Sequence, residues 1–411
     1  MNSAAFPGRI KIPAWLWTVL VLSGILIGPQ SLYPRTTDVS DETYAAQDIP
    51  IIKNPRTPHR GEITLQLEED LSIGSDLNEQ EAFYKNISFT IDDTGNFFIL
   101  DIGNDRIQKF SQSGEYLQTI GRSGQGPGDL NRPNFVFIGK DGTLYIYQPP
   151  SRLSLFDSNG HYLRAITFSS SPAFIARLGD SCFLGTTSQI MPQASRERII
   201  LFNAKGENVK TLAEFENENL LSVVGDQVIG AFQSFRPHLR CFRLNDDLGG
   251  FAFSGEYRIH IINSLGDTVR IIEKDEEPDK ISEAEKSKVI ENEIRLRRPK
   301  GLTLPTTEVK KAFVFPDHKP FFMDIISDDH ARIYVLKYQD FQKDKRLGYD
   351  MFDAQGKFIY EVKISLATPV LPRFFKGSFL YAVALDKEGI YLAKRYRIVN
   401  RALLDSYGLR Y

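Results

Sequence analysis

The stretch from Gly95 to Pro133, GNFFILDIGNDRIQKFSQSGEYLQTIGRSGQGPGDLNRP, contains the pattern that decides the fold. Short apolar runs alternate with turn residues, which is typical of short β-strands joined by hairpins. In the middle of the stretch, Ser111 precedes Gly114 by three positions. A Ser, Asn or Asp side chain caps the backbone of such a turn, and glycine adopts the positive φ that other residues resist. The stretch therefore predicts a unit of strand, turn, strand, loop, strand, turn and strand.

The same turn recurs along the chain. A small polar residue stands three positions before a glycine six times, at Ser111/Gly114, Asp157/Gly160, Asn203/Gly206, Asn263/Gly266, Asp353/Gly356 and Asp405/Gly408. A second Asp-x-x-Gly turn, expected between the first and second strands, occurs at Asp92/Gly95, Asp246/Gly249 and Asp386/Gly389. A β-rich repeat of about 40–50 residues is typical of propeller blades. We therefore predict an all-β fold, a six-bladed β-propeller with four-stranded blades, over residues 61–411.

The sixth unit is incomplete. Only three residues follow Gly408, too few for an outer strand, whereas Glu62–Leu67 is an alternating segment ahead of the first unit. An open ring would leave strand edges exposed, which proteins avoid. We expect Glu62–Leu67 to pair with the last blade and close the ring.

The segment Gly95–Pro133 resembles an NHL repeat, with its Asn-x-Arg-Ile and its closing Gly-x-x-Gly-x-Gly-Pro-Gly-x-x-x-x-Pro. The chain is similar to bacterial exported six-bladed propellers of the TolB-like kind, many of them lipoproteins of unassigned activity. The resemblance implies that Gly121–Gly128 is a crossover loop between two blades. A phosphate-binding loop would instead need Lys and Ser or Thr where Pro127 and Gly128 stand, so we expect no nucleotide.

The N-terminus resembles a membrane signal. Residues 12–34 carry no charge, and Arg9 and Lys11 precede them. The positive-inside rule places residues 1–11 in the cytoplasm, residues 12–28 as a transmembrane signal anchor and the remaining chain outside, periplasmic or extracellular. A cleaved signal peptide is the alternative, whereas Ile25 stands where a lipidated cysteine would be. Residues 29–60 contain five prolines and are expected to form an extended tether.

Composition excludes some functions and leaves the chemistry open. The 411 residues are 42% hydrophobic and carry a net charge of −2, which argues against nucleic-acid binding. The six histidines show no metal-binding spacing, and we expect no metal, cofactor or catalytic residue. Cys182 and Cys241 are expected as buried thiols, with a disulfide as the alternative. Four arginines that recur blade after blade are expected to be structural hydrogen-bond donors: Arg106, Arg152, Arg198 and Arg258.

One insertion interrupts the repeats. Residues 280–301 have Ser282 and Glu285 in capping-box spacing, apolar residues on one face and Pro299 as a stop, which predicts a helix over about 279–300. Its basic end contains Arg295, Arg297, Arg298 and Lys300. We expect the helix to pack on the rim of the propeller, with a partner or anionic-lipid contact as the alternative.

Function is expected on one face of the ring. The loops between second and third strands and the crossovers between blades share a face, here called the crossover face; the short turns lie on the opposite turn face. Long loops on a rigid scaffold usually carry binding residues. We predict an unknown protein, peptide or glycan ligand on the crossover face, around the channel mouth; the alternative is a metal-dependent lactonase-like or lyase-like enzyme in the central channel. The candidate contacts are Arg132, Gln148, Arg196, Arg236, His238, Tyr338 and Arg395.

Overall fold

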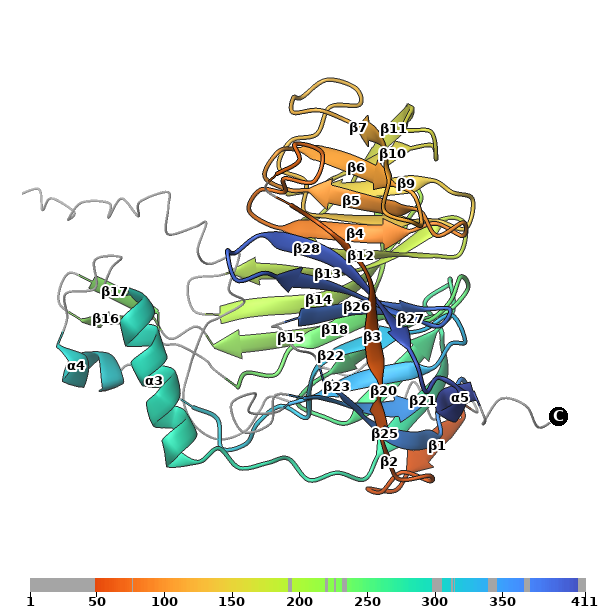
Figure 1. The fold of residues 1–411 in the computed structure, drawn as a ribbon. Helices are drawn as coiled ribbons and strands as arrows, with labels where there is room; N and C mark the ends of the chain where they lie inside the picture. The colour runs from red at the N-terminus through yellow and green to blue at the C-terminus, as the bar shows by residue number, and fades with distance from the viewer. Residues whose placement is uncertain are drawn as a thin grey trace, which may run out of the picture.

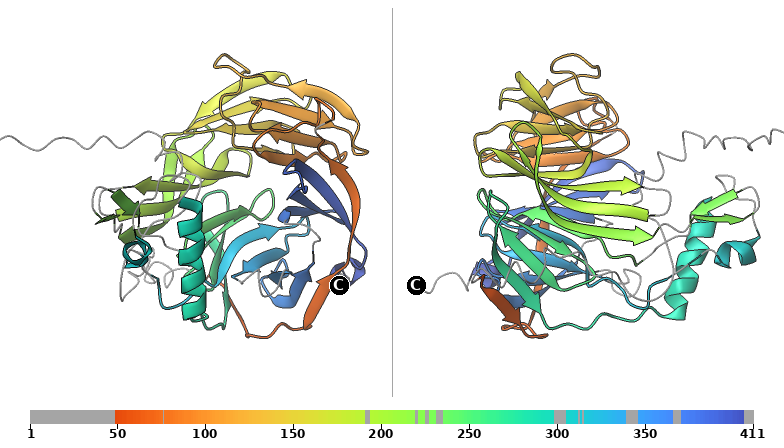
Figure 2. Two further views of the ribbon diagram at one scale, coloured as in Figure 1. Left: turned by 60° about the vertical axis from the view of Figure 1, so that its left-hand side comes forward. Right: turned by 180° about the vertical axis from the view of Figure 1, so that it is seen from behind.

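The computed structural model describes residues 49–75, 77–190, 194–218, 221–224, 227–230, 235–297, 305–311, 313, 315–338, 346–365 and 370–405. Six sheets stand around a common axis, each with four consecutive antiparallel strands running from the axis to the rim (Figures 1 and 2). The prediction of a six-bladed propeller with four-stranded blades is confirmed.

The first three blades follow one another along the chain, and each begins with its inner strand. Blade 1 contains β4 (Ile87–Ile91), β5 (Phe97–Asp101), β6 (Arg106–Phe110) and β7 (Tyr116–Ile120). Blade 2 contains β8 (Phe135–Ile138), β9 (Leu144–Gln148), β10 (Arg152–Phe156) and β11 (Tyr162–Thr167). Blade 3 contains β12 (Pro172–Leu178), β13 (Cys182–Ile190), β14 (Ala194–Asn203) and β15 (Asn208–Glu218).

The last three blades also take strands from the N-terminal segment. Blade 4 contains β18 (Leu239–Arg243), β19 (Gly249–Phe253), β20 (Arg258–Ile262), β21 (Thr268–Lys274) and, at its rim, β1 (Ile51–Asn54). Blade 5 contains β22 (Phe322–Ser327), β23 (Ile333–Lys337), β24 (Leu347–Phe352), β25 (Phe358–Ile364) and β2 (Glu62–Leu65). Blade 6 contains β26 (Val370–Lys376), β27 (Phe379–Leu385), β28 (Tyr391–Ile398) and β3 (Leu67–Ile73).

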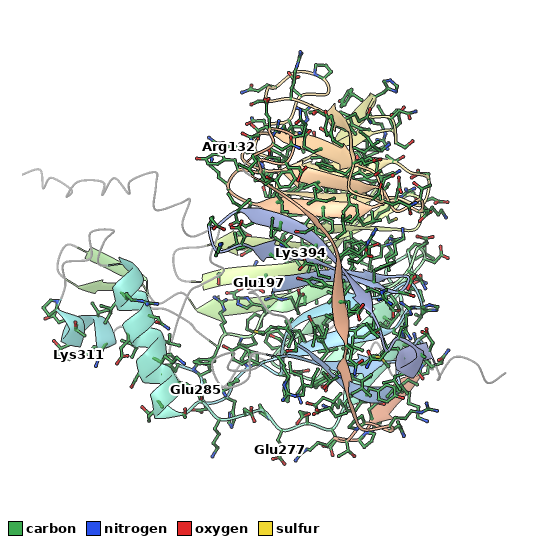
Figure 3. All side chains as sticks on the ribbon, viewed as in Figure 1. Arg132, Glu197, Glu277, Glu285, Lys311 and Lys394 are labelled. Atoms are coloured by element: carbon green, nitrogen blue, oxygen red, sulfur yellow. The ribbon has the colours of Figure 1, made fainter. Side chains whose placement is uncertain are left out.

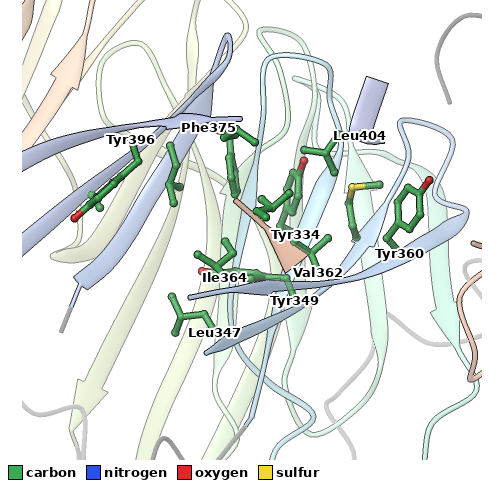
Figure 4. Close-up of a cluster of buried hydrophobic side chains, with 14 of the residues drawn as sticks. Tyr334, Leu347, Tyr349, Tyr360, Val362, Ile364, Phe375, Tyr396 and Leu404 are labelled. Carbon is green, nitrogen blue, oxygen red and sulfur yellow. The ribbon is translucent and has the colours of Figure 1, made fainter. Parts of the chain in front are cut away.

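The core lies between neighbouring blades. A blade in a ring has a neighbour on each face, so its second strand is buried throughout, as in β5 and β9. Between blades 5 and 6, Tyr334 stacks on Phe375 with ring centroids 4.5 Å apart (Figure 4). The turns pack just as closely, because a Cβ on Gly160 would stand 2.7 Å from Ile120 of the preceding blade. These contacts fix the angle between neighbouring blades.

The polar turn residues act as the sequence predicts in most blades. Asp157 accepts hydrogen bonds from the backbone N–H groups of Asn159 and His161, and Gly160 has φ +85°. The turn between the first and second strands of blade 5 escaped prediction because Ala331, at φ 56°, occupies the glycine position after Asp328.

Two predicted turns in blade 6 are corrected. The turn at Asp386/Gly389 joins β27 to β28, the second and third strands, and therefore lies on the crossover face. Asp405 ends the short helix α5 (Ala402–Asp405) and forms no hairpin turn. The outer strand of this blade comes from the N-terminus, so no hairpin follows the third strand.

Ring closure occurs as predicted in principle, but with other residues. Strand β3 pairs antiparallel with β28, and its Ile73 is buried between blades 6 and 1. The segment proposed for closure, Glu62–Leu67, instead supplies β2, which pairs parallel with the outer strand of blade 5. Strand β1 pairs in the same way with blade 4, although residues 51–54 were expected within the tether. The N-terminal segment therefore protects the edges of three successive blades.

Asn54 anchors this segment between blades 4 and 5. The side chain is buried; its Nδ2 donates to the carbonyl of Gly356 at 2.9 Å and its Oδ1 accepts from the N–H of Phe358 at 2.8 Å. The predicted transmembrane segment, residues 12–28, lies outside the described residues. Among the residues described, no helix is both long enough and apolar enough to span a bilayer.

The predicted helical insertion is present and is larger than expected. It contains α3 (Glu283–Arg297) and α4 (Thr306–Lys311), which lie beside the hairpin β16 (Leu221–Val224) and β17 (Gln227–Gly230). The group stands on the side of the disc toward which β13 and β15 point, which is the crossover face (Figure 1). The capping box is confirmed, because Ser282 Oγ accepts from the N–H of Glu285 at 3.3 Å and Glu285 Oε2 accepts from the N–H of Ser282 at 3.0 Å. Arg298, Pro299 and Lys300 lie outside the described residues.

Replacing Glu285 with Gln should weaken the attachment of α3 in a pH-dependent way. Burial disfavours the charged carboxylate, but bonds from Lys319, at 2.7 Å, and Ser282 outweigh it and lower the pKa of Glu285 from 4.5 to about 2. A carboxyl whose pKa is lower in the folded than in the unfolded chain stabilises the fold at pH values above the unfolded pKa. This contribution is lost as the pH falls toward the folded pKa. In urea unfolding, we expect the free energy of unfolding of the wild type to be about 1 kcal/mol larger than that of Glu285→Gln above pH ~5. This difference should vanish toward pH ~2. A pH-independent difference would contradict this account.

Candidate functional site

The glycine-rich segment Gly121–Gly128 joins the outer strand of blade 1 to the inner strand of blade 2, as predicted. Asp129 fills the centre of this loop: its carboxylate accepts from the N–H of Gly126 at 3.0 Å and from Arg122 Nε at 2.9 Å. A Cβ on Gly124 would stand 2.3 Å from Asp129 Oδ2. The loop therefore encloses a carboxylate of its own chain where a phosphate-binding loop would hold its ligand.

The recurring arginines make structural contacts, as the repeat predicted. Arg106 Nε donates to Asp101 at 3.0 Å, and Arg152 Nη2 donates to the carbonyl of Gly126 at 3.3 Å, which ties the glycine-rich loop to blade 2. Arg198 pairs with Glu214, and Arg258 pairs with Glu273 at 3.4 Å. Each contact links the third strand of a blade to a neighbouring strand or loop.

A charged cluster, here called the Glu197 cluster, lies on the crossover face between blades 3 and 4. Glu197, on β14, accepts from His238 Nδ1 at 2.8 Å and from the backbone N–H of Leu239 at 3.0 Å. Burial disfavours the ionised carboxyl, but the bond and charge of His238, the charge of Arg236 and the backbone N–H of Leu239 together hold the pKa of Glu197 below its ordinary value. Ser254 Oγ fixes His238 further by accepting its backbone N–H at 2.9 Å. The cluster thus joins the third strand of blade 3 to the first strand of blade 4.

Arg236 completes the Glu197 cluster from the crossover that precedes β18. Its side chain is buried, and Nη2 donates to Ser195 Oγ at 2.8 Å. Burial lowers the pKa of Arg236 to about 10, and the nearby charge of Glu197 offsets part of that shift. An arginine and a carboxylate held in a poorly hydrated place interact strongly with any further charge that approaches them.

An aromatic group adjoins the Glu197 cluster. Phe235, which has φ 74°, lies next to Tyr338 with ring centroids 5.5 Å apart and next to Phe315 at 6.2 Å. Tyr338 follows the second strand of blade 5, and Phe315 belongs to the segment that returns from the insertion. Blades 3, 4 and 5 therefore contribute to one continuous region of the crossover face.

The structure brings three of the seven predicted contact residues to this region. Arg236, His238 and Tyr338 are neighbours, as described. Arg196 lies on β14 between Ser195 and Glu197 but points to the opposite face of the sheet, where it pairs with Glu216 at 2.6 Å. Arg132 is exposed on the crossover from blade 1 to blade 2, and its N–H donates to Asp105 at 3.0 Å (Figure 3). It lies on the same face but on other blades.

Two predicted residues have structural surroundings. Gln148 is 2% exposed, donates to Ser154 at 2.7 Å and accepts from the N–H of Asn131 at 2.6 Å. Arg395 does not lie on the crossover face, where it was expected. It pairs with Asp70 on β3, and it donates to the carbonyl of Gln112 in the β6–β7 turn, on the turn face. Strand β28 runs toward the turn face, so its midpoint lies far from the crossover loops.

Sequence reasoning missed Glu197, Ser195 and Phe235. The sequence predicts a long loop over residues 186–197, whereas β13 and β14 continue through most of that range as an extended hairpin. The alternation of Ser195, Arg196 and Glu197 was the available signal, since alternate residues of a strand point to opposite faces. Within the described part of the chain, no group of three or more His, Cys, Asp or Glu side chains could hold a metal ion. Cys182 and Cys241 are free thiols, and burial raises the pKa of Cys241.

The fold defines the chain as a six-bladed β-propeller. A family model described as a 6-bladed beta-propeller, DUF5128, matches residues 80–231. A candidate exported protein from Bacteroides fragilis NCTC 9343 is similar in structure, with 11% identity, TM-score 0.48 and coverage of 85% of this chain and 99% of that one. A DUF4221 member from Bacteroides vulgatus has 12% identity, TM-score 0.46 and coverage of 81% and 98%. Virginiamycin B lyase from Staphylococcus aureus has 13% identity, TM-score 0.38 and coverage of 82% and 89%. No curated protein sequence matches the chain.

Proposed function

We propose that this chain is an exported propeller that binds a protein, peptide or glycan ligand through the crossover face of blades 3 to 5. One observation carries the proposal: Arg236 and His238, from the crossover into blade 4, and Tyr338, from blade 5, meet in one region around the Glu197 cluster. Buried charges beside aromatic rings are common at the centres of binding surfaces. The insertion stands on the same side of the disc and would border the ligand (Figure 2).

Export and membrane attachment form the second part of the proposal. They are supported by the sequence, in which Arg9 and Lys11 precede 23 uncharged residues from Ile12 to Pro34. Such a segment would hold the propeller outside the cytoplasmic membrane by an N-terminal helix. The described part of the chain begins at the rim of blade 4, with β1.

The binding proposal predicts that two sets of substitutions differ in effect. A crossover-face variant replaces Arg236, His238 and Tyr338 with Ala; a turn-face variant replaces Asp93, His161 and Lys205, three exposed residues of turns, with Ala. Wild-type protein is first screened on peptide and glycan arrays, and the strongest ligand is titrated against both variants. We expect at least a tenfold loss of affinity for the crossover-face variant, about 1.4 kcal/mol, and unchanged affinity for the turn-face variant.

The reverse result, with both variants still folded by circular dichroism, would place the ligand on the turn face. The alternative function, a metal-dependent propeller enzyme, is tested on the same preparation by elemental analysis. Stoichiometric metal bound to wild-type protein, together with lactone hydrolysis that a chelator abolishes, would replace the binding proposal with the enzyme.

A further inference from the structure

Three charged side chains stand on the inner strands of three consecutive blades. Arg240 lies on β18 of blade 4, Asp324 on β22 of blade 5 and Arg373 on β26 of blade 6. Strand β22 contacts both β18 and β26, so the three residues follow one another around the axis. The inner strands β4 and β8 carry no charged residue, and Arg177, Arg243 and Lys376 lie at or near the turn-face ends of β12, β18 and β26. We refer to these three side chains as the axial triad.

Arg240 and Asp324 are held in position by backbone groups. Arg240 Nε donates to the carbonyl of Met323 at 2.9 Å, and its Nη1 donates to the carbonyl of Leu239 at 3.2 Å. Asp324 Oδ1 accepts from the N–H of Ile325 at 2.9 Å. These bonds use only part of the hydrogen-bonding capacity of the two side chains, because a guanidinium has five N–H donors and a carboxylate about four acceptor sites.

Arg373 has no such support. It stands at a β-bulge of β26 between Pro372 and Phe374. Strand β22 has a matching bulge between Phe322 and Asp324, so Asp324 is the first paired residue after it. Bulges redirect side chains and are common next to functional sites. Within the described residues, the guanidinium of Arg373 makes neither a hydrogen bond nor an ion pair, and no ion pair joins Asp324 to either arginine. The axial triad is therefore charged but not paired internally.

The axial triad reaches solvent, although burial still shifts the pKa values of two of its members. Asp324 and Arg373 are both solvent-exposed side chains. Burial nevertheless raises the pKa of Asp324, against the opposing influence of Arg240 and Arg373, and burial also lowers the pKa of Arg373. Exposed surface combined with poor hydration is expected of groups that line a narrow passage. There, a ligand that replaces water gains more from charge pairing than on an open surface.

We propose that the axial triad binds a small hydroxylated carboxylate, of the sugar-acid class, at the axis of the propeller. Arg240 and Arg373 present donors for the carboxylate of the ligand. A planar guanidinium can form two parallel hydrogen bonds with a carboxylate, which favours arginine over lysine at such a site. Asp324, which can only accept when ionised, takes the hydroxyl groups of the ligand. Next to β18, the inner strand β12 carries Phe174, which is 39% exposed and offers a ring for the apolar face of a sugar. This site does not depend on a ligand at the Glu197 cluster.

The test uses D-glucuronate as the probe, with D-glucose and acetate as partial mimics. Isothermal titration of the wild-type chain should show binding of glucuronate, at least tenfold weaker binding of acetate and none of glucose. Arg373→Gln should weaken glucuronate binding at least tenfold, and Asp324→Asn should weaken glucuronate but leave acetate unchanged. Arg243→Gln, which removes the same charge from the turn-face end of β18, should bind like wild type.

Each other outcome removes a defined part of the proposal. Absence of glucuronate binding to the wild type, or equal binding by Arg373→Gln, overturns the axial site. Equal affinity for acetate and glucuronate, with no effect of Asp324→Asn, overturns the sugar-acid class and leaves a simple anion site. Thermal unfolding of each variant is measured alongside, and Arg373→Lys, which keeps the charge but not the planar donors, should retain part of the affinity if Arg373→Gln misfolds.

Discussion

Replacing Lys274 with methionine is expected to lower the free energy of unfolding by about 3–5 kcal/mol. Lys274 ends β21, and its side chain is only 1% exposed. Its ammonium donates to Asp350 Oδ2 at 2.8 Å and to Glu276 Oε2 at 2.6 Å. Asp350 is fully buried between blades 4 and 5, where its Oδ2 also accepts a hydrogen bond from the hydroxyl of Tyr257 at 2.6 Å. Without Lys274, the charge of Asp350 would stay buried and unbalanced.

The measurement is urea unfolding at neutral pH, and two further variants make it specific. Lys387→Met removes an ammonium that is 88% exposed and should change stability by less than about 0.5 kcal/mol. The double variant Lys274→Met with Asp350→Asn removes both charges and keeps an acceptor for Tyr257, so it should recover at least half of the loss. If Lys274→Met alone behaves like Lys387→Met, the buried pair contributes little to stability.

The sequence was sufficient for the fold because each blade repeats a local signal. The turn at Asp157 and Gly160 depends on residues within four positions of each other, and such contacts are visible in a sequence. The closing strand was harder to assign, since β2 and β3 are adjacent alternating segments and only the partner strands distinguish them. The turn at Asp328 was hidden by Ala331, a residue that rarely adopts a positive φ.

The candidate site could be predicted only in part, because it depends on contacts between blades. His238 and Glu197 are 41 residues apart, and nothing local indicates that they meet. Gln148 could have been recognised as structural, since it pairs across the sheet with Arg152 just as Asp101 pairs with Arg106. Arg395 was misplaced for a different reason: the turn at Asp386 and Gly389 was expected between the first and second strands, so β28 was assigned as a second strand, which would run toward the crossover face.

Two N-terminal truncations are expected to separate ring closure from edge protection. A chain that begins at Leu67 lacks β1 and β2 but retains β3, the outer strand of blade 6. It should remain monomeric and unfold in one transition at a lower temperature, because the buried Leu65 and the bonds of Asn54 to blade 5 are lost. A chain that begins at Ser75 also lacks β3 and should aggregate or lose its cooperative transition.

The reason for the difference is the position of β3 in the ring. Strand β28 of blade 6 pairs with β3 over residues 393–398, and Ile73 packs among residues of blades 6 and 1; its burial alone contributes about 1.5–3 kcal/mol. Strands β1 and β2 instead lie outside blades that already have four strands. Size-exclusion chromatography and thermal unfolding of both truncations provide the measurement. If the chain from Ser75 is as monomeric and as stable as the chain from Leu67, blade 6 holds with three strands and β3 does not close the ring.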